Sequence, residues 1–157
     1  IGTVSSEAKA ELARAQGYAH VINYAQEDVA QRVRELTDGQ GVPVVYDGVG
    51  RDTFDASLAC LQPRGMLVSF GNASGKPAPL DLQTLATLGS LYVTRPTLLT
   101  YTATTEELRQ SSAAVFDRLL AGVLTVTIGQ RYPLADVARA HRDLEGRVTT
   151  GSTIILP

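Results

Sequence analysis

The chain has 157 residues, of which 44% are apolar and 19% charged, which is the composition of an ordinary globular domain. The net charge of −2 gives no signal for binding a polyanion such as nucleic acid, and no apolar run approaches the roughly 18–20 residues of a membrane helix. The single cysteine, Cys60, excludes an internal disulfide and a cysteine-rich metal site, and it favours a reducing, cytoplasmic setting.

Strand-like and helix-like segments alternate from the first residue. The helical periodicity is clear where Val29, Val33 and Leu36 share one face, and residues 42–46 form an apolar run typical of a strand buried on both faces. We expect strands over residues 1–4, 20–23, 42–46, 65–70 and 91–94, with helices over 8–16, 28–37, 52–60 and 81–88. Such alternation predicts an α/β fold with βαβ units in a doubly wound, Rossmann-like parallel sheet.

The C-terminal third follows another pattern. Thr104 to Glu107 forms a capping box, so the longest helix should begin there and end at Ala121, before Gly122. Residues 123–128 and 153–156 resemble strands, with a helix over 136–145 between them.

In a doubly wound sheet, ligands bind at the carboxyl ends of the strands. Ser5 and Ser6 follow the first strand, and Lys9 lies one helical turn later. Two hydroxyls and a cation at a helix N-terminus suit a phosphate, although Glu7 opposes this unless it points away. A plain N-cap with a solvated surface lysine explains the same residues.

The next two strand ends are rich in glycine, as in Gly48-Val49-Gly50 and Phe70-Gly71-Asn72, which lets a backbone approach a ligand closely. Tight strand-to-helix turns would use glycine equally well. No G-x-G-x-x-G occurs, His20 and His141 lack the spacing of a zinc site, and no general acid, base or nucleophile stands out. We therefore assign no catalytic or metal-binding residue, which is consistent with hydride transfer, where the cofactor carries the chemistry.

At these strand ends the sequence resembles the zinc-independent quinone oxidoreductases of the medium-chain dehydrogenase/reductase family, the zeta-crystallin-like branch. The matching stretches span the chain in order: residues 1–4, 21–24, 44–51, 65–72, 89–96, 132–134 and 151–157.

The resemblance implies that about half of the enzyme precedes Ile1, including a catalytic domain and the first strand and glycine turn of the Rossmann domain. Residues 1–122 would then be a truncated NADP-binding domain. Residues 123–157 would be a segment that packs back on the missing catalytic domain. We expect the fragment to be inactive alone.

The resemblance also implies roles for individual residues toward NADP(H). Lys9 would hold the 2′-phosphate with Ser5 and Ser6 beside it, and Tyr24 would contact the adenosine end. The remaining contacts would come from Gly48 and Val49 along the groove, Phe70, Gly71 and Asn72 at the nicotinamide, Pro96, Thr97 and Leu98 closing over it, and Arg147 reaching back. Relatives often carry Ser at position 48 and Gly-Thr at positions 5 and 6, so these two departures change the polar groups available.

The implied activity is NADPH-dependent reduction of a quinone, by a homodimer that pairs through the edge strand over residues 91–94. That apolar strand could equally be covered by the helix that starts at Thr104. Two other functions remain open: an enoyl reductase module of a larger synthase, and a non-catalytic unit that binds NADPH or dimerises.

Overall fold

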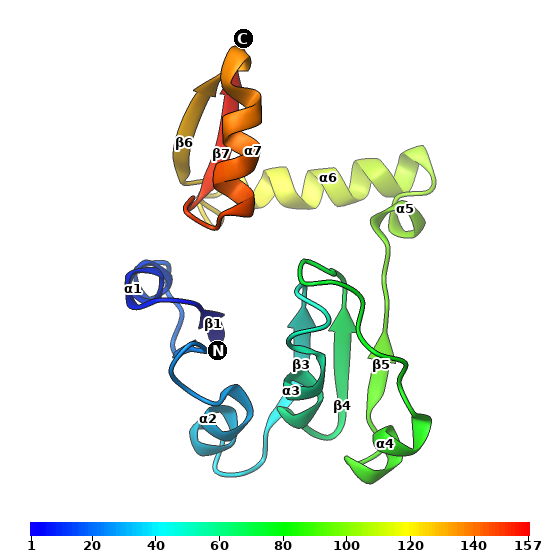
Figure 1. The fold of residues 1–157 in the computed structure, drawn as a ribbon. Helices are drawn as coiled ribbons and strands as arrows, with labels where there is room; N and C mark the ends of the chain where they lie inside the picture. Colours follow the sequence, from blue (N-terminus) through cyan, green and yellow to red (C-terminus); the bar gives the residue numbers. More distant parts are fainter. The chain divides into compact units, whose positions relative to one another are not determined.

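The computed structural model describes residues 1–157, which form two compact units, Ile1–Tyr101 and Thr102–Pro157. Strands and helices alternate strictly in the first unit (Figure 1). Its elements are β1 (Gly2–Val4), α1 (Glu7–Ala15), β2 (Val21–Asn23), α2 (Val29–Leu36), β3 (Val42–Asp47), α3 (Phe54–Ala59), β4 (Leu61–Ser69), α4 (Leu82–Thr87), β5 (Tyr92–Thr94) and α5 (Leu98–Tyr101).

Every strand pair in the first unit is parallel, which confirms the predicted α/β class. The strands form two sheets rather than the single sheet that the alternation predicts: β1–β2, and β3–β4–β5 in that order. No hydrogen bonds join β1 to β3, and residues of both strands line one cavity.

The core of the first unit consists of two apolar clusters. Phe54 and Leu58, four positions apart on one face of α3, pack with Leu61, Leu67 and Leu91. The second cluster contains Ile22, Val33 and Cys60, so the single cysteine lies in the core. Burial also raises the pKa of the Cys60 thiol, which keeps it protonated.

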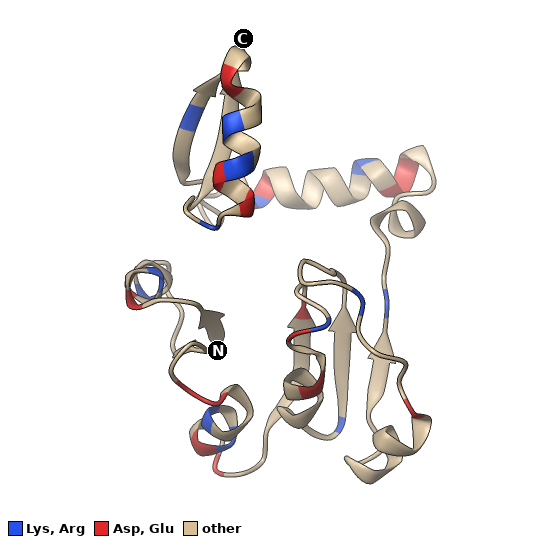
Figure 2. Ribbon diagram, in the orientation of Figure 1, with Lys and Arg blue, Asp and Glu red and all other residues tan.

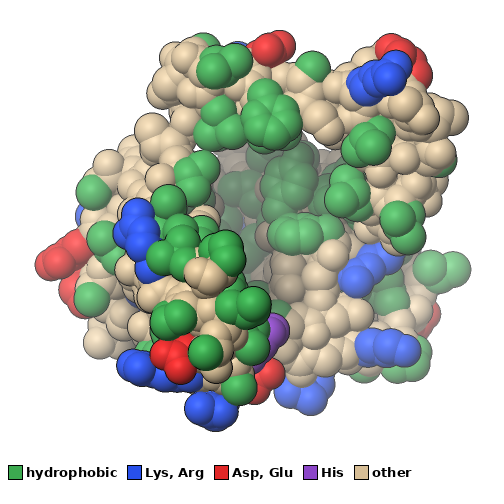
Figure 3. All heavy atoms as spheres, turned by 90° about the horizontal axis from the view of Figure 1, so that it is seen from above, with side chains coloured by type: hydrophobic (Ala, Val, Ile, Leu, Met, Phe, Trp, Pro, Cys, Tyr) green, Lys and Arg blue, Asp and Glu red, His purple; other side chains and the backbone are tan.

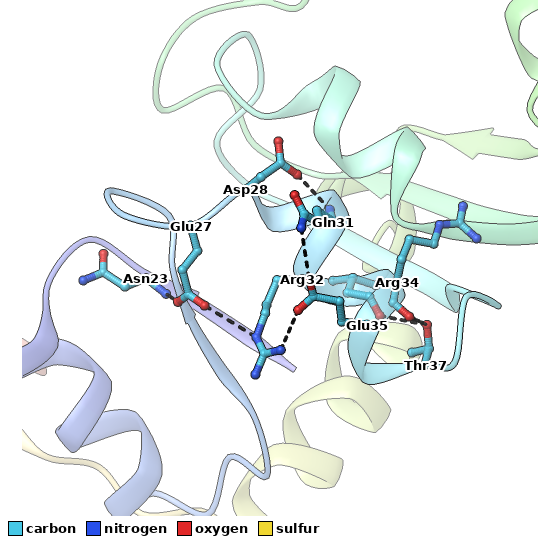
Figure 4. Close-up of polar contacts among 9 residues, drawn as sticks. Asn23, Glu27, Asp28, Gln31, Arg32, Arg34, Glu35 and Thr37 are labelled. Atoms are coloured by element: carbon cyan, nitrogen blue, oxygen red, sulfur yellow. Dashed lines mark hydrogen bonds and ion pairs between the residues drawn. The ribbon is translucent and has the colours of Figure 1, made fainter.

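Polar contacts fix both ends of α2 (Figure 4). The Asp28 carboxylate accepts from the Gln31 N–H at 2.7 Å, which caps the N-terminus, and Thr37 Oγ1 donates to the Val33 carbonyl at 2.8 Å near the C-terminus. Arg34 donates to four main-chain carbonyls, of Gly39, Gln40, Ala59 and Leu61, at 2.8–3.0 Å. This guanidinium therefore joins the end of α2 to the amino ends of β3 and β4.

The second unit contains α6 (Thr105–Leu120), β6 (Ile128–Pro133), the 3₁₀ turn Leu134–Asp136, α7 (Val137–Glu145) and β7 (Ser152–Leu156), and β6 pairs with β7 in parallel. The predicted capping box is present: the Glu107 N–H donates to Thr104 Oγ1 at 3.2 Å, and the Thr104 N–H donates to the Glu107 carboxylate at 2.9 Å. Tyr132, the buried aromatic of this unit, donates its hydroxyl to Asp143 at 2.7 Å.

One local prediction in the C-terminal third is wrong, and one short helix of the first unit was not predicted. Residues 123–127 form no strand, and β6 begins only at Ile128. The apolar run at 123–128 matched strand propensity, yet pairing with β7 selects a later segment, in which Gly129 allows the Thr150 carbonyl to approach closely. The four-residue helix α5 was not expected, because it is too short to show a period.

Charged side chains lie mainly on the helices and in the loops, and the strands carry few of them (Figure 2). Many large apolar side chains are nevertheless exposed on the surface (Figure 3). In β3, Val44 is 39% and Tyr46 73% exposed, so the expectation that this strand is buried on both faces is wrong for the chain by itself. No helix is long and apolar enough to cross a membrane.

Candidate functional site

Four of the predicted site residues meet at the carboxyl ends of β1 and β2. The Tyr24 N–H donates to the Val4 carbonyl at 3.0 Å, which brings Tyr24 beside the start of α1. Ser6 is the N-cap of α1, with its hydroxyl 3.4 Å from the Lys9 N–H. Ser5, Ser6 and Lys9 are half-buried there, and Tyr24 is exposed.

Glu7, which could have repelled a phosphate at this helix end, is paired elsewhere. Its carboxylate accepts from Arg14 at 2.7 Å, two turns along the surface of α1. The Glu7 side chain is therefore directed along the helix surface, where Arg14 balances its charge. Ser5 and Ser6 precede the first turn of α1 and Lys9 lies within that turn, at the positive end of the helix dipole.

The second group of predicted residues meets at the carboxyl ends of β3 and β4. The Asp47 carbonyl accepts from the Phe70 N–H at 2.9 Å and from the Gly71 N–H at 3.3 Å. A Cβ on Gly71 would lie 2.2 Å from the Gly48 carbonyl oxygen, and a Cβ on Gly48 would lie 3.0 Å from the ring of Phe70. Glycine at both positions therefore permits the direct contact between these two turns.

The turn after β3 is further tied to the loop after β4. The Val49 carbonyl accepts from the Ser74 N–H at 2.8 Å and from the Ser74 hydroxyl at 2.9 Å. The Arg51 N–H donates to the Gly75 carbonyl at 3.0 Å. The glycine-rich segments therefore form one connected surface, with Val49 partly exposed on it.

A third segment, residues 95–98 after β5, is connected to the same edge through Arg95. One terminal nitrogen of Arg95 lies within 3.0–3.3 Å of four acceptors, on Ser69, Gly71 and Asn72. The predicted residues Pro96 and Thr97 follow directly, and Leu98 begins α5 with its side chain exposed.

Arg147, the last predicted cofactor contact, belongs to the other unit. It lies between α7 and β7 in the left-handed region, at φ 58°. Its role toward a bound cofactor stays a prediction.

A cavity of about 460 Å³ lies between the β1–β2 and β3–β4–β5 sheets. Its wall is largely apolar and includes Ile1, Tyr18, Val44 and Tyr46. Tyr24, Gly48 and Val49 also line it, so it connects the two groups of predicted residues. No group of three or more His, Cys, Asp or Glu in residues 1–157 is arranged to hold a metal ion.

Sequence reasoning missed two residues that organise this edge, Asp47 and Arg95. Asp47 is 3% exposed and its carboxylate accepts from two N–H groups and two hydroxyls. Burial by itself would raise the pKa of Asp47, but the hydrogen bonds from Gly50, Ser57, Thr53 and Val49 outweigh it and lower the pKa. An aspartate directly before a glycine turn was the available signal, since such side chains commonly cap the next N–H groups.

A family model described as zinc-binding dehydrogenase matches residues 16–155. The chain belongs to this family. It is 54% identical over its full length to a quinone oxidoreductase of Pseudomonas aeruginosa, and 47% identical to a 2-haloacrylate reductase of a Burkholderia species. The crystal structure of Escherichia coli quinone oxidoreductase complexed with NADPH is similar over the whole chain, with a TM-score of 0.95 at 49% identity.

The chain spans about half the length of the curated relatives that it matches, 48% of the Pseudomonas protein and 47% of the Burkholderia protein. In the solved structure it corresponds to 49% of the polypeptide. The resemblance to half of a quinone oxidoreductase, drawn from the strand ends, is therefore confirmed.

Proposed function

We propose that the protein containing this chain reduces quinones or similar conjugated carbonyl compounds with NADPH, and that residues 1–122 supply most of its nucleotide-binding domain. The observation that carries the proposal is the group of Ser5, Ser6 and Lys9 at the N-terminus of α1, with Glu7 paired to Arg14. A fold that prefers NAD usually has an acid at this strand end for the ribose 2′-hydroxyl, whereas donors and a cation suit the 2′-phosphate of NADPH. The similarity to an NADPH-bound quinone oxidoreductase supports the same cofactor.

In this proposal the chain binds and orients the cofactor. Lys9 pairs with the 2′-phosphate, and Tyr24 contacts the adenosine end. The surface formed by Gly48, Val49 and residues 70–72 holds the nicotinamide end, with residues 96–98 closing over it and Arg147 reaching back to it. NADPH supplies the hydride when bound, and the protein excludes water and fixes the orientation for its transfer.

The cofactor assignment is tested with the full-length protein and a Lys9→Ala variant, by comparing kcat/KM for NADPH and NADH with a simple benzoquinone. We expect the variant to lose about tenfold or more in kcat/KM for NADPH, since a charge-assisted phosphate contact contributes about 1.5–3 kcal/mol, and to retain its activity with NADH. Lys76→Ala is the matched control, because it removes the same charge from an exposed position in the loop after β4. Equal losses with NADPH and NADH would refute the role of Lys9 in binding the 2′-phosphate.

A second acceptor class is favoured by the 47% identity to a 2-haloacrylate reductase, an enzyme named for an α,β-unsaturated acid. An enoyl reductase would likewise deliver hydride to a conjugated carbon–carbon double bond. Turnover of an acrylate but not of a quinone would favour this class. NADPH binding without turnover of either acceptor would favour a non-catalytic binding unit.

We also propose that the first unit lacks one strand of its sheet. The free edges of β1 and β3 both face the cavity, and Val44 and Tyr46 are exposed beside it. A parallel strand from the preceding part of the protein would join the two sheets into one. Residues 123–157 would return to the catalytic domain that this preceding part contains.

The quaternary proposal rests on an exposed strand edge, and the cellular proposal rests on the single cysteine. β5 is an outer strand of its sheet and exposes Tyr92, so we propose a homodimer that pairs through this edge. The unpaired, buried thiol of Cys60 is compatible with a reducing cytoplasm.

A further inference from the structure

The carboxylate of Asp47 is the centre of a hydrogen-bond network that the sequence analysis did not predict. Its Oδ1 accepts from the N–H groups of Val49 at 2.8 Å and Gly50 at 3.0 Å. Its Oδ2 accepts from the hydroxyls of Thr53 and Ser57, both at 2.8 Å. All four donors are uncharged, and the residue is buried at the carboxyl end of β3, so the network holds a charged group inside the protein.

The same residue also holds the neighbouring turn through its main chain. The Asp47 carbonyl accepts from Phe70 and Gly71, and Gly71 lies against Gly48 with no room for a Cβ. One residue therefore fixes both glycine turns at the carboxyl edge of the sheet, the turn after β3 by its side chain and the turn after β4 by its carbonyl.

The bonding pattern determines what the first turn can offer to a ligand. The N–H groups of Val49 and Gly50 are directed to Asp47, and the Val49 carbonyl is bound by Ser74. A ligand at this turn would therefore meet the Gly48 backbone and the partly exposed Val49 side chain as a contact surface of fixed shape. Such a surface selects by fit, so a small displacement of the turn would weaken binding.

We propose that Asp47 is a positioning residue that sets the backbone of residues 48–50 and 70–71 for NADPH, without touching the cofactor itself. This inference rests on the proposed function, because it concerns the same cofactor site. It predicts that loss of the carboxylate weakens NADPH binding more than it slows turnover at saturating NADPH.

The test uses the full-length protein and the variants Asp47→Ala and Asp47→Asn, with NADPH affinity measured by fluorescence titration and KM and kcat measured with benzoquinone. Asp47→Ala should raise the Kd and KM for NADPH about tenfold, the equivalent of roughly 1.4 kcal/mol, with kcat changed by less than about threefold. Asp47→Asn should restore most of the affinity. Its amide oxygen can still accept from Val49 and Gly50, and the hydroxyls of Thr53 and Ser57 can turn to accept from its NH₂ group.

Arg34→Gln is the matched control for a loss of stability alone. Arg34 also makes four hydrogen bonds, but it lies at the amino ends of β3 and β4, away from the proposed site. It should lower the unfolding temperature and leave the KM for NADPH unchanged. Thr53→Val, which removes one hydroxyl from the network and keeps Asp47, should raise the KM mildly and provides a reading if Asp47→Ala fails to fold.

The inference is overturned if Asp47→Ala has the same KM for NADPH as the wild-type protein. If Asp47→Ala does not fold, a wild-type KM for NADPH in Thr53→Val overturns it instead. Asp47 would then be a purely structural residue. This result is distinct from a failure of the proposed function, in which the wild-type protein itself would not bind NADPH.

Discussion

Gly71 is the position at which a single methyl group should disturb the candidate site most directly. Alanine there would place its Cβ 2.2 Å from the Gly48 carbonyl oxygen, 2.7 Å from the Gly48 Cα and 2.8 Å from its carbonyl carbon. An ordinary contact between a carbon and a carbonyl oxygen is about 3.3 Å, so the two turns would have to separate by about 1 Å. The Cβ is fixed rigidly to the main chain of residue 71, and the atoms that it meets belong to the main chain of Gly48, so rotation of a side chain gives no relief.

The surrounding hydrogen bonds resist this separation. The Gly71 N–H donates to the Asp47 carbonyl at 3.3 Å, and the Gly71 carbonyl accepts from Arg95 at 3.0 Å. Overpacking of a fixed site costs about 1–3 kcal/mol. If the cofactor requires the undisturbed turns, a cost of about 2 kcal/mol corresponds to a roughly thirtyfold increase in the Kd for NADPH.

The assay is a fluorescence titration of NADPH into the full-length Gly71→Ala protein. Gly39→Ala is the matched control: its φ of 81° makes alanine unfavourable there, but a Cβ would meet nothing within 4 Å, and the residue lies away from the carboxyl edge of the sheet. The control should lose some stability and keep its affinity for NADPH. A folded Gly71→Ala protein with a Kd within about twofold of the wild-type value would refute the contact between the two turns as a requirement for binding.

Two further predictions concern stability. The pKa of Asp47 is lowered in the folded state, so its contribution to stability is present above its unfolded pKa and is lost as the pH falls through the folded value. Chemical unfolding between pH 7 and pH 3 should therefore show a steeper loss of stability below about pH 4 in the wild-type protein than in Asp47→Asn, and equal slopes would contradict the assignment. Thr104→Ala removes one half of the capping box of α6 and should destabilise the start of that helix by about 1 kcal/mol, seen as faster hydrogen exchange of its first turns while α7 is unchanged.

The segments predicted best were those whose signal is local. The cap of α6 and the apolar face of α2 depend on residues three or four positions apart, and both are present. The start of β6 could not be predicted in the same way. Residues 123–128 have the stronger strand composition, but the strand forms later, through Gly129 and Gln130, because that segment pairs with β7.

The candidate site shows the same division between local and distant information. Glycines at strand ends indicated either a close approach to a ligand or a tight turn, and the structure adds a direct contact between the two turns, through Gly48 and Gly71. The pairing of Glu7 with Arg14 could not be settled by the sequence, because an acid at a helix start can turn toward the strand end or along the helix surface. Only the side-chain geometry shows which of these two directions the acid takes.

Strand β3 illustrates how a sequence can encode surroundings that the chain does not itself provide. Its uninterrupted apolar composition predicts a strand covered on both faces, yet Tyr46 is 73% exposed and β3 borders a cavity with β1 on the opposite side. A strand whose own residues had evolved for exposure would alternate polar and apolar side chains, and β3 does not. The mismatch is what the proposed additional strand between β1 and β3 would explain. An added strand at the open edges of β1 and β3 would cover apolar residues that line the cavity, among them Val44 and Tyr46.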